Sequence, residues 1–442
     1  MKRNQLGRVV VGIGVCLLLA ATARAGEKAF DWKRYSGKEI NVVLALQPWS
    51  DFLKPKIPEF ESLTGIKVHL EVLPEDQSRQ KLAIAFTSGK GEVDVFGSQR
   101  HQEGIKYYQA GWYEPLARFA KDPQYSSPDF DVSDLSAKAI DDATVNGGLI
   151  GISLYTDLEL LMYRKDLFAA AGVRVPQNFA DLEDAAKKLT DKAKGVYGIC
   201  LRGKGAATTT IFSGFLHGMG GSWADKDNNP ALNTPAALKA FDYYGRMARE
   251  YGPPGVVNYH WFQCQNLVAS GKAAMWVDST VQASALFDVK ISQVADKMSF
   301  AVFPEGPAGR KPAGGSWYLS IHSKSKNKEA AWYFIAWAVG KENSLKAQLH
   351  GIPTARISPW VSEAFKKGDQ HPDFTKVIVE SIKIKDTPSW GSPWVAGGEM
   401  RDVIGAVVVT AIEAGDTKAA ADKAVAQIQS IREKSGEKIV QK

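Results

Sequence analysis

Residues 39–96 read EINVVLALQPWSDFLKPKIPEFESLTGIKVHLEVLPEDQSRQKLAIAFTSGKGEVDVF, and this stretch decides the fold class. Apolar or alternating runs predict three β-strands, at 39–46, 66–73 and 93–96. Two helices are predicted between them, at 54–64 and 76–88, and Gly65 stands where a left-handed helix cap is favoured. Because strands and helices alternate, the stretch indicates an α/β layer with a largely parallel sheet.

The rest of the 442-residue chain continues this alternation and then becomes mostly helical. A chain of this length exceeds the size at which single cores stop growing, so we expect two lobes. No low-complexity linker separates them, which indicates that the chain passes between the lobes several times. The further predicted elements are strands at 151–155 and 197–201, a helix after 155 that runs through 167, and helices at 181–190, 235–251, 261–271, 330–339, 400–414 and 419–431.

The N-terminus predicts export from the cytoplasm. Three basic residues precede an apolar stretch from Val9 to Ala21, which ends at the small-residue site Ala23-Arg24-Ala25. This is the pattern of a secretory signal peptide over residues 1–25, and its apolar part is shorter than the ~20 residues that span a bilayer as a helix. We therefore expect a soluble mature protein in the periplasm.

The formal charge of +7 does not indicate a nucleic-acid partner. Four of the 55 basic residues lie in the expected signal peptide, which leaves 51 against 48 acidic residues, and no basic block stands out. Beyond residue 25 the only cysteines are Cys200 and Cys264. One disulfide is therefore possible, but not a disulfide scaffold.

The spacings that catalysis requires are missing from the sequence. There is no phosphate-binding loop, no strand-bound GxGxxG and no GxSxG elbow. The seven histidines include no i,i+4 pair, so we expect no metal site and no cofactor. We expect a binding protein and not an enzyme. Two acids from distant parts of the chain could still form a glycosidase pair, so a secreted carbohydrate-active enzyme stays open as an alternative.

Five stretches of the chain are in register with one known family. They are PEFESLTGIKV (58–68), AGWYEPL (110–116), LLMYRKDLF (160–168), GKAAM (271–275) and SKNKEAA (325–331). Their order and spacing resemble those of the extracellular solute-binding proteins of the maltose-binding type, the sugar-capturing components of bacterial ABC importers. The resemblance implies a periplasmic-binding-protein-like type II fold, in which a multi-crossing hinge joins two α/β lobes and the ligand lies in the cleft between them.

Carried over onto this chain, the resemblance implies three crossings between the lobes, near 153–157, 276–280 and 316–320. It implies an N-terminal lobe of residues 26–154 and 279–316 and a C-terminal lobe of residues 155–278 and 317–442. Hinge closure would sequester the ligand from water. The implied partners are a small-molecule ligand and the transmembrane subunits of an ABC permease, with the binding protein itself a monomer.

Four residues of the N-terminal part are candidate ligand contacts because they follow strands. Gln47 and Trp49 come after the first strand, and Gln99 and Arg100 come after the strand at 93–96. Ligands bind beyond the carboxyl ends of strands in open α/β sheets. Ordinary surface loops also contain Gln and Arg, so a structural role is the alternative for each.

Four further candidates follow from their positions in the resemblance. Asp157 matches a hinge-proximal acidic ligand position with Tyr155 just before it, and Asp278 lies at the second implied crossing. A carboxylate accepts two hydroxyl hydrogen bonds at once, which suits vicinal diols. The alternative for Asp157 is a helix N-cap, since Leu158 is predicted to begin a helix. Arg356 resembles an arginine that faces the cleft in related proteins, and a solvated surface arginine is its alternative.

Tryptophans supply the flat apolar faces on which sugar rings stack. Of the twelve in the chain, Trp223 and Trp317 each end a Gly-Gly-Ser-Trp tetrad, where glycine permits close backbone approach. Trp390 and Trp394 bracket a Pro/Gly/Ser loop, and we expect one of the two to stack on ligand. Packing within or between the lobes is the alternative for all four.

The first two loops depart from the maltose-binding pattern. Gln47-Pro48-Trp49 stands in place of a charged pair, and Gly97 stands where the second loop would carry an aromatic residue. The resemblance therefore implies a sugar, polyol or short glycoside and not a maltodextrin. Another small polar solute, such as a polyamine or a peptide, is the runner-up, and a binding protein that serves chemotaxis or signalling would have the same sequence features.

Overall fold

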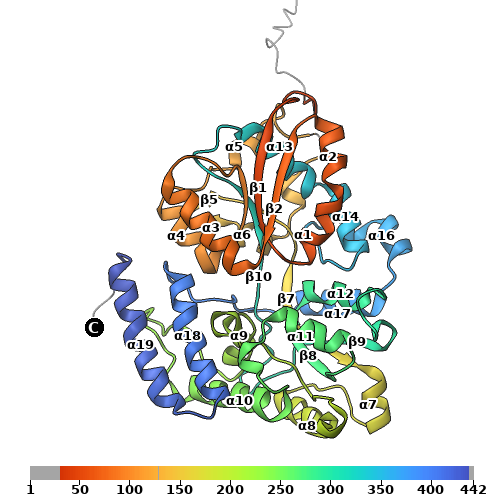
Figure 1. Ribbon diagram of the computed structural model, residues 1–442, viewed down its shortest axis with the longest axis vertical. Helices are drawn as coiled ribbons and strands as arrows, with labels where there is room; N and C mark the ends of the chain where they lie inside the picture. The colour runs from red at the N-terminus through yellow and green to blue at the C-terminus, as the bar shows by residue number, and fades with distance from the viewer. Residues whose placement is uncertain (1–29, 128, 438–442) are drawn as a thin grey trace, which may run out of the picture.

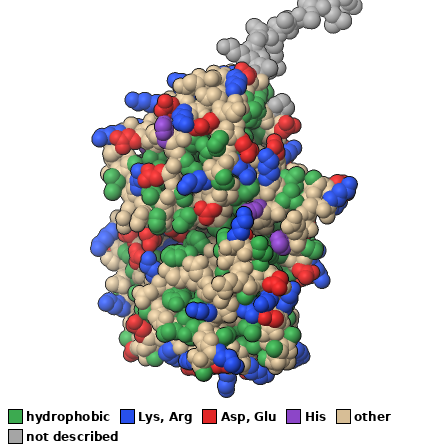
Figure 2. All heavy atoms as spheres, turned by 45° about the vertical axis from the view of Figure 1, so that its right-hand side comes forward, with side chains coloured by type: hydrophobic (Ala, Val, Ile, Leu, Met, Phe, Trp, Pro, Cys, Tyr) green, Lys and Arg blue, Asp and Glu red, His purple; other side chains and the backbone are tan. Residues whose placement is uncertain are grey.

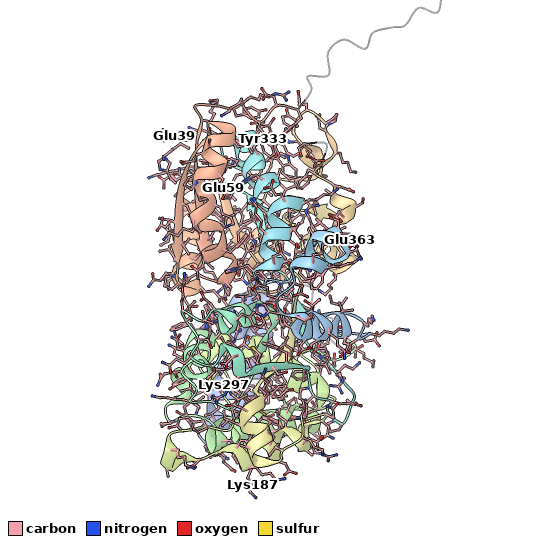
Figure 3. All side chains as sticks on the ribbon, turned by 90° about the vertical axis from the view of Figure 1, so that its right-hand side faces the viewer. Glu39, Glu59, Lys187, Lys297, Tyr333 and Glu363 are labelled. Carbon is pink, nitrogen blue, oxygen red and sulfur yellow. A yellow bond between two sulfur atoms is a disulfide. The ribbon has the colours of Figure 1, made fainter. Side chains whose placement is uncertain are left out.

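The computed structural model describes residues 30–127 and 129–437, and its two lobes lie one above the other along the longest axis (Figure 1). Figure 3 shows the same division from the side, with Glu39, Glu59 and Glu363 in one lobe and Lys187 and Lys297 in the other. The two α/β lobes expected from the sequence are confirmed. The expected signal peptide, residues 1–25, lies outside the described residues.

The N-terminal lobe is built on a five-stranded sheet in the order β2-β1-β3-β11-β6. β1 pairs in parallel with β2 and β3, as the opening stretch of sequence predicts, and β11 runs antiparallel to β3 and β6. The strands are β1(Glu39–Ala45), β2(Lys67–Leu73), β3(Val95–Ser98), β6(Ile152–Ser153) and β11(Tyr318–Ile321), and a small hairpin is formed by β4(Thr144–Val145) and β5(Gly148–Leu149).

Helices pack around this sheet and bury its apolar side chains in two hydrophobic clusters, one with Val42 and Leu44 and the other with Val43 and Phe96. The helix predicted at 54–64 is a 3-10 turn over Lys54–Lys56 followed by α2, and the separate short helix α1 precedes it. Each of the three begins with a proline in its first turn, Pro48, Pro55 or Pro58, where proline is tolerated. Gly65 ends α2 with φ of 72°, which is the left-handed cap predicted from the sequence. The helices are α1(Pro48–Leu53), α2(Ile57–Thr64), α3(Glu75–Ser88), α4(Ile105–Gln109), α5(Ala117–Lys121), α6(Ala137–Asp142), α13(Lys328–Ala338), α14(Lys341–Leu349), α15(Ser358–Val361) and α16(Glu363–Gly368).

The C-terminal lobe has a smaller sheet in which β7 pairs with β8, β9 and β10. β7 occupies the segment for which the sequence predicted a helix, and that prediction is wrong. Nearly every residue of DLELLMYR is buried. The run therefore shows neither the period of an amphipathic helix nor the alternation of a half-buried strand, and periodicity cannot tell a helix from a strand here. The strands are β7(Asp157–Arg164), β8(Met275–Ser279), β9(Met298–Val302) and β10(Gly314–Gly315).

The remaining helices surround this second sheet and form the lower part of Figure 1. The longest of them lie where the sequence predicts helices. They are α7(Lys165–Ala171), α8(Phe179–Leu189), α9(Thr208–Gly218), α10(Pro235–Tyr251), α11(Trp261–Ala269), α12(Ser284–Phe287), α17(Pro372–Ile382), α18(Gly397–Ile412) and α19(Thr417–Lys434).

The chain passes between the lobes at 153–157, at 315–318 and between α16 and α17. The chain does not cross between the lobes at 276–280, where a crossing was expected. Val281 touches the N-terminal core, but β8 before it and β9 after it both pair with β7 in the C-terminal lobe. The expected lobe boundaries after residue 279 are therefore wrong. β9 keeps residues 298–302 in the C-terminal lobe, and β11, α13 and α14 return 318–349 to the N-terminal lobe.

Charges of both signs are interspersed over the surface, and Figure 2 shows Lys and Arg side chains among Asp and Glu over the visible face. No extended field of one sign covers that face. Within residues 30–127 and 129–437, none of the helices combines the length and the apolar composition that a membrane crossing requires.

Candidate functional site

A small polar cavity lies between the lobes, next to the crossing segments, and we call it the interlobe cavity. Its volume is about 30 Å³. Both lobes contribute to its wall, which consists mainly of amide, charged and aromatic side chains. The lining residues are Leu46, Gln47, Glu75, Gln99, Gln102, Tyr155, Asp157, Arg202, Thr210, Trp261, Ser279, Val281, Gln282, Trp317 and Trp390.

Gln47 and Gln99 line the cavity because β1 and β3 are parallel and end at the same edge of the sheet. Gln102 joins them and donates a hydrogen bond from Nε2 to Oε1 of Gln99. The two residues beside these glutamines lie elsewhere. Trp49 is only 2% exposed and packs in the N-terminal core, because α1 begins at Pro48 and turns the indole inward. Arg100 points to the surface and pairs with Asp141 at 3.4 Å.

The first crossing places Tyr155 and Asp157 in the cavity wall. The hydroxyl of Tyr155 donates a hydrogen bond to Oε1 of Gln47. Asp157 begins β7 and not a helix, so the alternative that it caps a helix is wrong. Its Oδ1 accepts hydrogen bonds from the Thr280 hydroxyl at 2.7 Å and from the Val281 amide at 3.1 Å. Burial raises the pKa of Asp157 to about 7, although these two hydrogen bonds act to lower it.

Asp278 lies behind the cavity wall and holds Arg202, which lines it. The Arg202 guanidinium donates to both carboxylate oxygens, with a distance of 2.8 Å from Nε to Oδ2, and the indole of Trp276 donates to the same oxygen at 3.0 Å. Asp278 is fully buried, so a direct ligand contact by this residue does not fit the structure. Its acceptor sites already serve the protein, and Arg202 is the group that faces the cavity.

The four candidate tryptophans separate into two pairs. Trp317, in the crossing at 315–318, and Trp390, between α17 and α18, line the interlobe cavity, and Trp317 also packs in the N-terminal core. Trp223 and Trp394 do not, because both are buried in the C-terminal core. The Trp394 indole donates to Oδ1 of Asn228 at 3.1 Å. Of the two tryptophans, one of which is expected to stack on ligand, Trp390 lines the interlobe cavity and Trp394 does not, and stacking on ligand stays a prediction.

Arg356 also lies away from the interlobe cavity. Its guanidinium is buried and donates to the carbonyl oxygens of Val339 at 2.6 Å and Asp131 at 2.7 Å, with Asp134 at 3.3 Å. It therefore fixes the loops of the N-terminal lobe to one another. Neither a solvated surface role nor a contact in the interlobe cavity fits this geometry.

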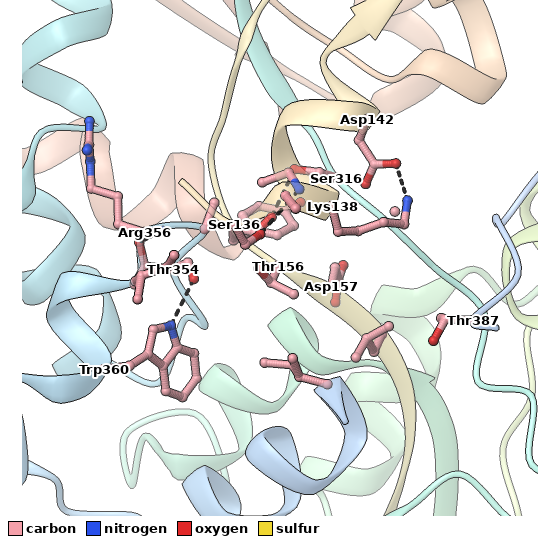
Figure 4. A pocket seen from close by; sticks show the side chains of 18 of the residues that line it. Ser136, Lys138, Asp142, Thr156, Asp157, Ser316, Thr354, Arg356, Trp360 and Thr387 are labelled. Carbon is pink, nitrogen blue, oxygen red and sulfur yellow. Dashed lines mark hydrogen bonds and ion pairs between the residues drawn. The ribbon is translucent and has the colours of Figure 1, made fainter. Parts of the chain in front are cut away.

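A larger groove of about 700 Å³ adjoins the crossing segments, and we call it the hinge groove. Figure 4 shows it with Trp360 on one side and Thr156 and Asp157 on the crossing strand. Side chains such as Val379 and Ile382 make its wall largely apolar. The Trp360 indole donates to the carbonyl oxygen of Thr354 at 3.1 Å, so its polar atom is already bonded.

Sequence reasoning missed nine of the fifteen residues of the cavity wall. Five of these, Glu75, Gln102, Arg202, Trp261 and Gln282, carry no local motif and come from five separate segments of the chain. The strand-end rule finds only residues directly after strands. The Cys200–Cys264 pair was the one available signal, because this disulfide ties the segment before Arg202 to the first turns of the helix that Trp261 begins.

Two buried polar atoms of the cavity residues have no hydrogen-bond partner among the described residues. They are the acceptor Oε1 of Gln282 and the donor Nε1 of Trp390. Buried polar groups are normally bonded, and leaving one unpaired costs about 1–3 kcal/mol. One unpartnered donor and one unpartnered acceptor on two residues of the same cavity wall match a hydroxyl group, which donates one hydrogen bond and accepts another. Residues 30–127 and 129–437 contain no cluster of His, Cys, Asp or Glu that could hold a metal ion.

Residues 47–344 match the profile of the family described as bacterial extracellular solute-binding protein. The chain is 30% identical to the mannitol-binding protein of Pseudomonas aeruginosa over 336 residues, which cover 74% of each chain. It is 26% identical to the erythritol/L-threitol-binding protein of Mycolicibacterium smegmatis over 381 residues, or 81% of this chain and 80% of the relative.

Solved structures share the fold over most of the chain. An ABC transporter solute-binding protein from Agrobacterium vitis with bound D-mannitol superposes with a TM-score of 0.80 and 27% identity, covering 90% of this chain and 99% of that one. A second, from Agrobacterium radiobacter in complex with ribitol, gives 0.81 and 25%, covering 91% and 100%.

Proposed function

Because the chain belongs to the bacterial extracellular solute-binding protein family, we propose that it captures a polyol or a small sugar in the interlobe cavity and delivers it to an ABC permease. The observation that carries this proposal is the pair of unpartnered atoms, Gln282 Oε1 and Trp390 Nε1, in a cavity rich in amide side chains. Polyol relatives such as the mannitol-binding protein of Pseudomonas aeruginosa support the ligand class.

The proposed contacts divide by chemistry. Gln47, Gln99, Gln282 and Asp157 offer oxygen acceptors to ligand hydroxyls, and Arg202 offers donors. Trp317 and Trp390 offer aromatic faces for the carbon chain or ring. An alternating set of donors and acceptors on both sides of a carbon backbone is what a chain of hydroxyl groups requires.

The cavity volume implies lobe movement during binding. About 30 Å³ holds roughly two water molecules, which is far less than a hexitol needs. A ligand of that size therefore enters only as the lobes separate and the wall side chains shift. The crossing segments at 153–157 and 315–318 flank the cavity and are the parts of the chain that bend when two lobes rotate about a hinge.

The charges of the cavity favour a hydroxylated ligand over a polyamine. A polyamine site needs a surplus of unpaired carboxylates. Here Glu75 is already paired with Arg79 at 2.7 Å, and Arg202 adds a positive charge to the wall. We likewise infer binding and not catalysis. A glycosidase needs a protonated acid and a free carboxylate on opposite sides of the glycosidic bond, and the Glu75 carboxylate is already paired with Arg79.

Location and assembly belong to the same proposal. The pattern of residues 1–25 supports export to the periplasm, where the protein would act as a monomer and dock on the transmembrane subunits of its permease. Uptake and not signalling is the proposed role, since the two solved structures compared above are ABC transporter solute-binding proteins.

Isothermal titration calorimetry tests the ligand class. Erythritol, ribitol, D-mannitol and D-glucose would be titrated in parallel with spermidine and a dipeptide, and we expect heat only from the hydroxylated compounds. Trp317→Ala should weaken the tightest of them by about tenfold or more, because a buried aromatic face contributes on the order of 1.5–3 kcal/mol.

Trp360→Ala is the matched control because this indole lines the hinge groove and not the interlobe cavity. Its affinity should equal that of the unmodified protein. Loss of binding in Trp360→Ala with retention in Trp317→Ala would move the ligand to the hinge groove. Binding of spermidine or the dipeptide alone would overturn the ligand class, and product formed from a glycoside on long incubation would overturn the binding role.

A further inference from the structure

One buried arginine at the lobe interface has no carboxylate partner among the described residues. The other arginines of comparable burial each have a carboxylate oxygen within 4.0 Å, supplied by Asp166, Asp278, Asp134 and Glu437 for Arg164, Arg202, Arg356 and Arg432. Arg401, in α18, is only 5% exposed and has no such ion pair among the described residues. Its hydrogen bond is to the hydroxyl of Thr210, at 3.1 Å from Nη1 to Oγ1.

The carboxylates near Arg401 already bond to other arginines. Besides burial, the groups that act most strongly on Arg401 are two arginines, Arg79 and Arg202, and two glutamates, Glu75 and Glu103. Both glutamates bond to Arg79, and Arg202 bonds to Asp278. Burial, and then the nearby charge of Arg79, lower the pKa of Arg401 to about 10, which still leaves the guanidinium charged at neutral pH. A buried and unpaired cation is costly unless an anion joins it.

Arg401 lies in the wall of a groove that continues the interlobe cavity, which we call the outer groove. The outer groove has a volume of about 620 Å³. Glu75 and Gln102 line both spaces, so the two meet there. Thr210, which accepts the hydrogen bond from Arg401, lines the interlobe cavity. A ligand that fills the cavity and extends past Gln102 therefore reaches the guanidinium.

We propose that Arg401 binds a carboxylate of the ligand, so that the chain prefers hydroxylated acids, such as aldonates or uronates, over the corresponding neutral alditols. The inference rests on the proposed function, since the hydroxylated part of the ligand occupies the interlobe cavity. A guanidinium binds a carboxylate through two parallel hydrogen bonds, and such charge-assisted bonds are about twice as strong as neutral ones. This is the partner that each of the other buried arginines already has.

A single negative charge fits this place better than a phosphate. Arg401 is one guanidinium without a direct carboxylate partner among the described residues. Five carboxylates, from Glu75, Asp76, Glu103, Glu399 and Asp402, line the same groove and repel a second negative charge. The phosphate ester of the same alditol should therefore bind more weakly than the carboxylate. This separates two kinds of anionic ligand in one series of titrations.

Matched pairs of ligands test the inference by calorimetry. D-mannitol would be compared with D-mannonate, ribitol with D-ribonate, and D-mannitol 1-phosphate would be added as the second anion. We expect each acid to bind about ten- to a hundredfold more tightly than its alditol, the range for a hydrogen-bonded charged pair. Arg401→Gln should reduce this ratio to near one, and Arg401→Lys, which keeps the charge, should retain part of it.

The control is Arg246→Gln, because Arg246 also belongs to the C-terminal lobe but lies away from the cleft. It is half-exposed and pairs with Glu183 at a distance of 2.8 Å. It should leave the ratio unchanged. Alditols that bind as tightly as the acids, or an Arg401→Gln protein that loses both ligands equally, would overturn the inference and leave the proposed function standing. Binding of neither series would overturn both. Circular dichroism and thermal unfolding of each variant exclude loss of folding as the cause.

Discussion

The hydroxyl of Thr280 donates a hydrogen bond of 2.7 Å to the carboxylate of Asp157. Thr280 directly follows β8, and Asp157 begins β7 at the first crossing between the lobes. The bond therefore links the end of one strand of the C-terminal lobe to the crossing segment, at a carboxylate that also lines the interlobe cavity. Any change of charge on Asp157 should therefore change both the ligand affinity and the stability of the protein.

Alditol affinity should rise with pH through the pKa of Asp157. Burial raises that pKa to about 7, and a ligand hydroxyl donates more strongly to the ionised carboxylate than to the neutral acid. Titrations of D-mannitol between about pH 6 and pH 8 should show an affinity that increases severalfold. Asp157→Asn should bind more weakly and show a flat profile, and an unchanged slope in that variant would assign the titration to another group.

The same group predicts an opposite pH dependence of stability. The pKa of Asp157 in the folded protein lies above its ordinary value of 3.8, so its contribution to stability is fully present below about pH 3.8 and is lost as the pH rises through 7. Urea unfolding should therefore find Asp157→Asn more stable relative to the unmodified protein at about pH 8 than at pH 5. A difference that is constant with pH would contradict this assignment.

Trp390 and Trp394 should respond differently to the same substitution. Trp390→Phe removes an indole N–H that has no protein partner and lines the cavity, so ligand affinity should fall by about three- to tenfold. Trp394→Phe removes an N–H that is bonded to Asn228, so stability should fall by about 1 kcal/mol beyond the loss of ring volume, with affinity unchanged. Calorimetry measures the ligand affinity of both variants, and urea unfolding measures their stability. Equal affinities of the two variants would refute the prediction.

Asp278 should stabilise the folded protein because it is the counter-charge of the buried Arg202. Asp278→Asn leaves the buried guanidinium without a counter-charge, and breaking such a pair costs about 3–5 kcal/mol. Affinity should also fall, because Arg202 lines the cavity. Glu363→Gln breaks an exposed pair with Lys366 and should change the free energy of unfolding by less than about 1 kcal/mol. Urea unfolding measures both, and similar small effects would show that Arg202 finds another partner.

The disulfide should stabilise the C-terminal lobe. Cys200 and Cys264 are 64 residues apart, and closing a loop of this length stabilises the folded state by about 4 kcal/mol in the chain-entropy account. The double variant Cys200→Ala, Cys264→Ala should lose that amount in urea unfolding and become insensitive to a dithiol reductant. A reductant that destabilises the double variant as much as the unmodified protein would show a different cause.

The sequence by itself determined the local structure where one period dominated. The runs at 39–46 and 66–73 became parallel strands, Gly65 became a left-handed cap, and Gln47 and Gln99 reached the cavity because they follow two parallel strands that end at one edge. In each case the deciding interactions lie within a few residues or follow from a general rule about sheets.

Only the tertiary structure decided the rest. It made a strand of 157–164, whose residues are buried on both sides and so carry no period, and it returned β11 to the first sheet by pairing it with β3 more than 200 residues earlier. It also placed Trp317 and Trp390 in the cavity wall, with Trp317 packed in the N-terminal core as well, and left Trp49, Trp223 and Trp394 in the cores alone. Local sequence cannot make that separation, because the same aromatic side chain is favoured in a core and in a binding site, and only contacts between distant segments decide which of the two it occupies.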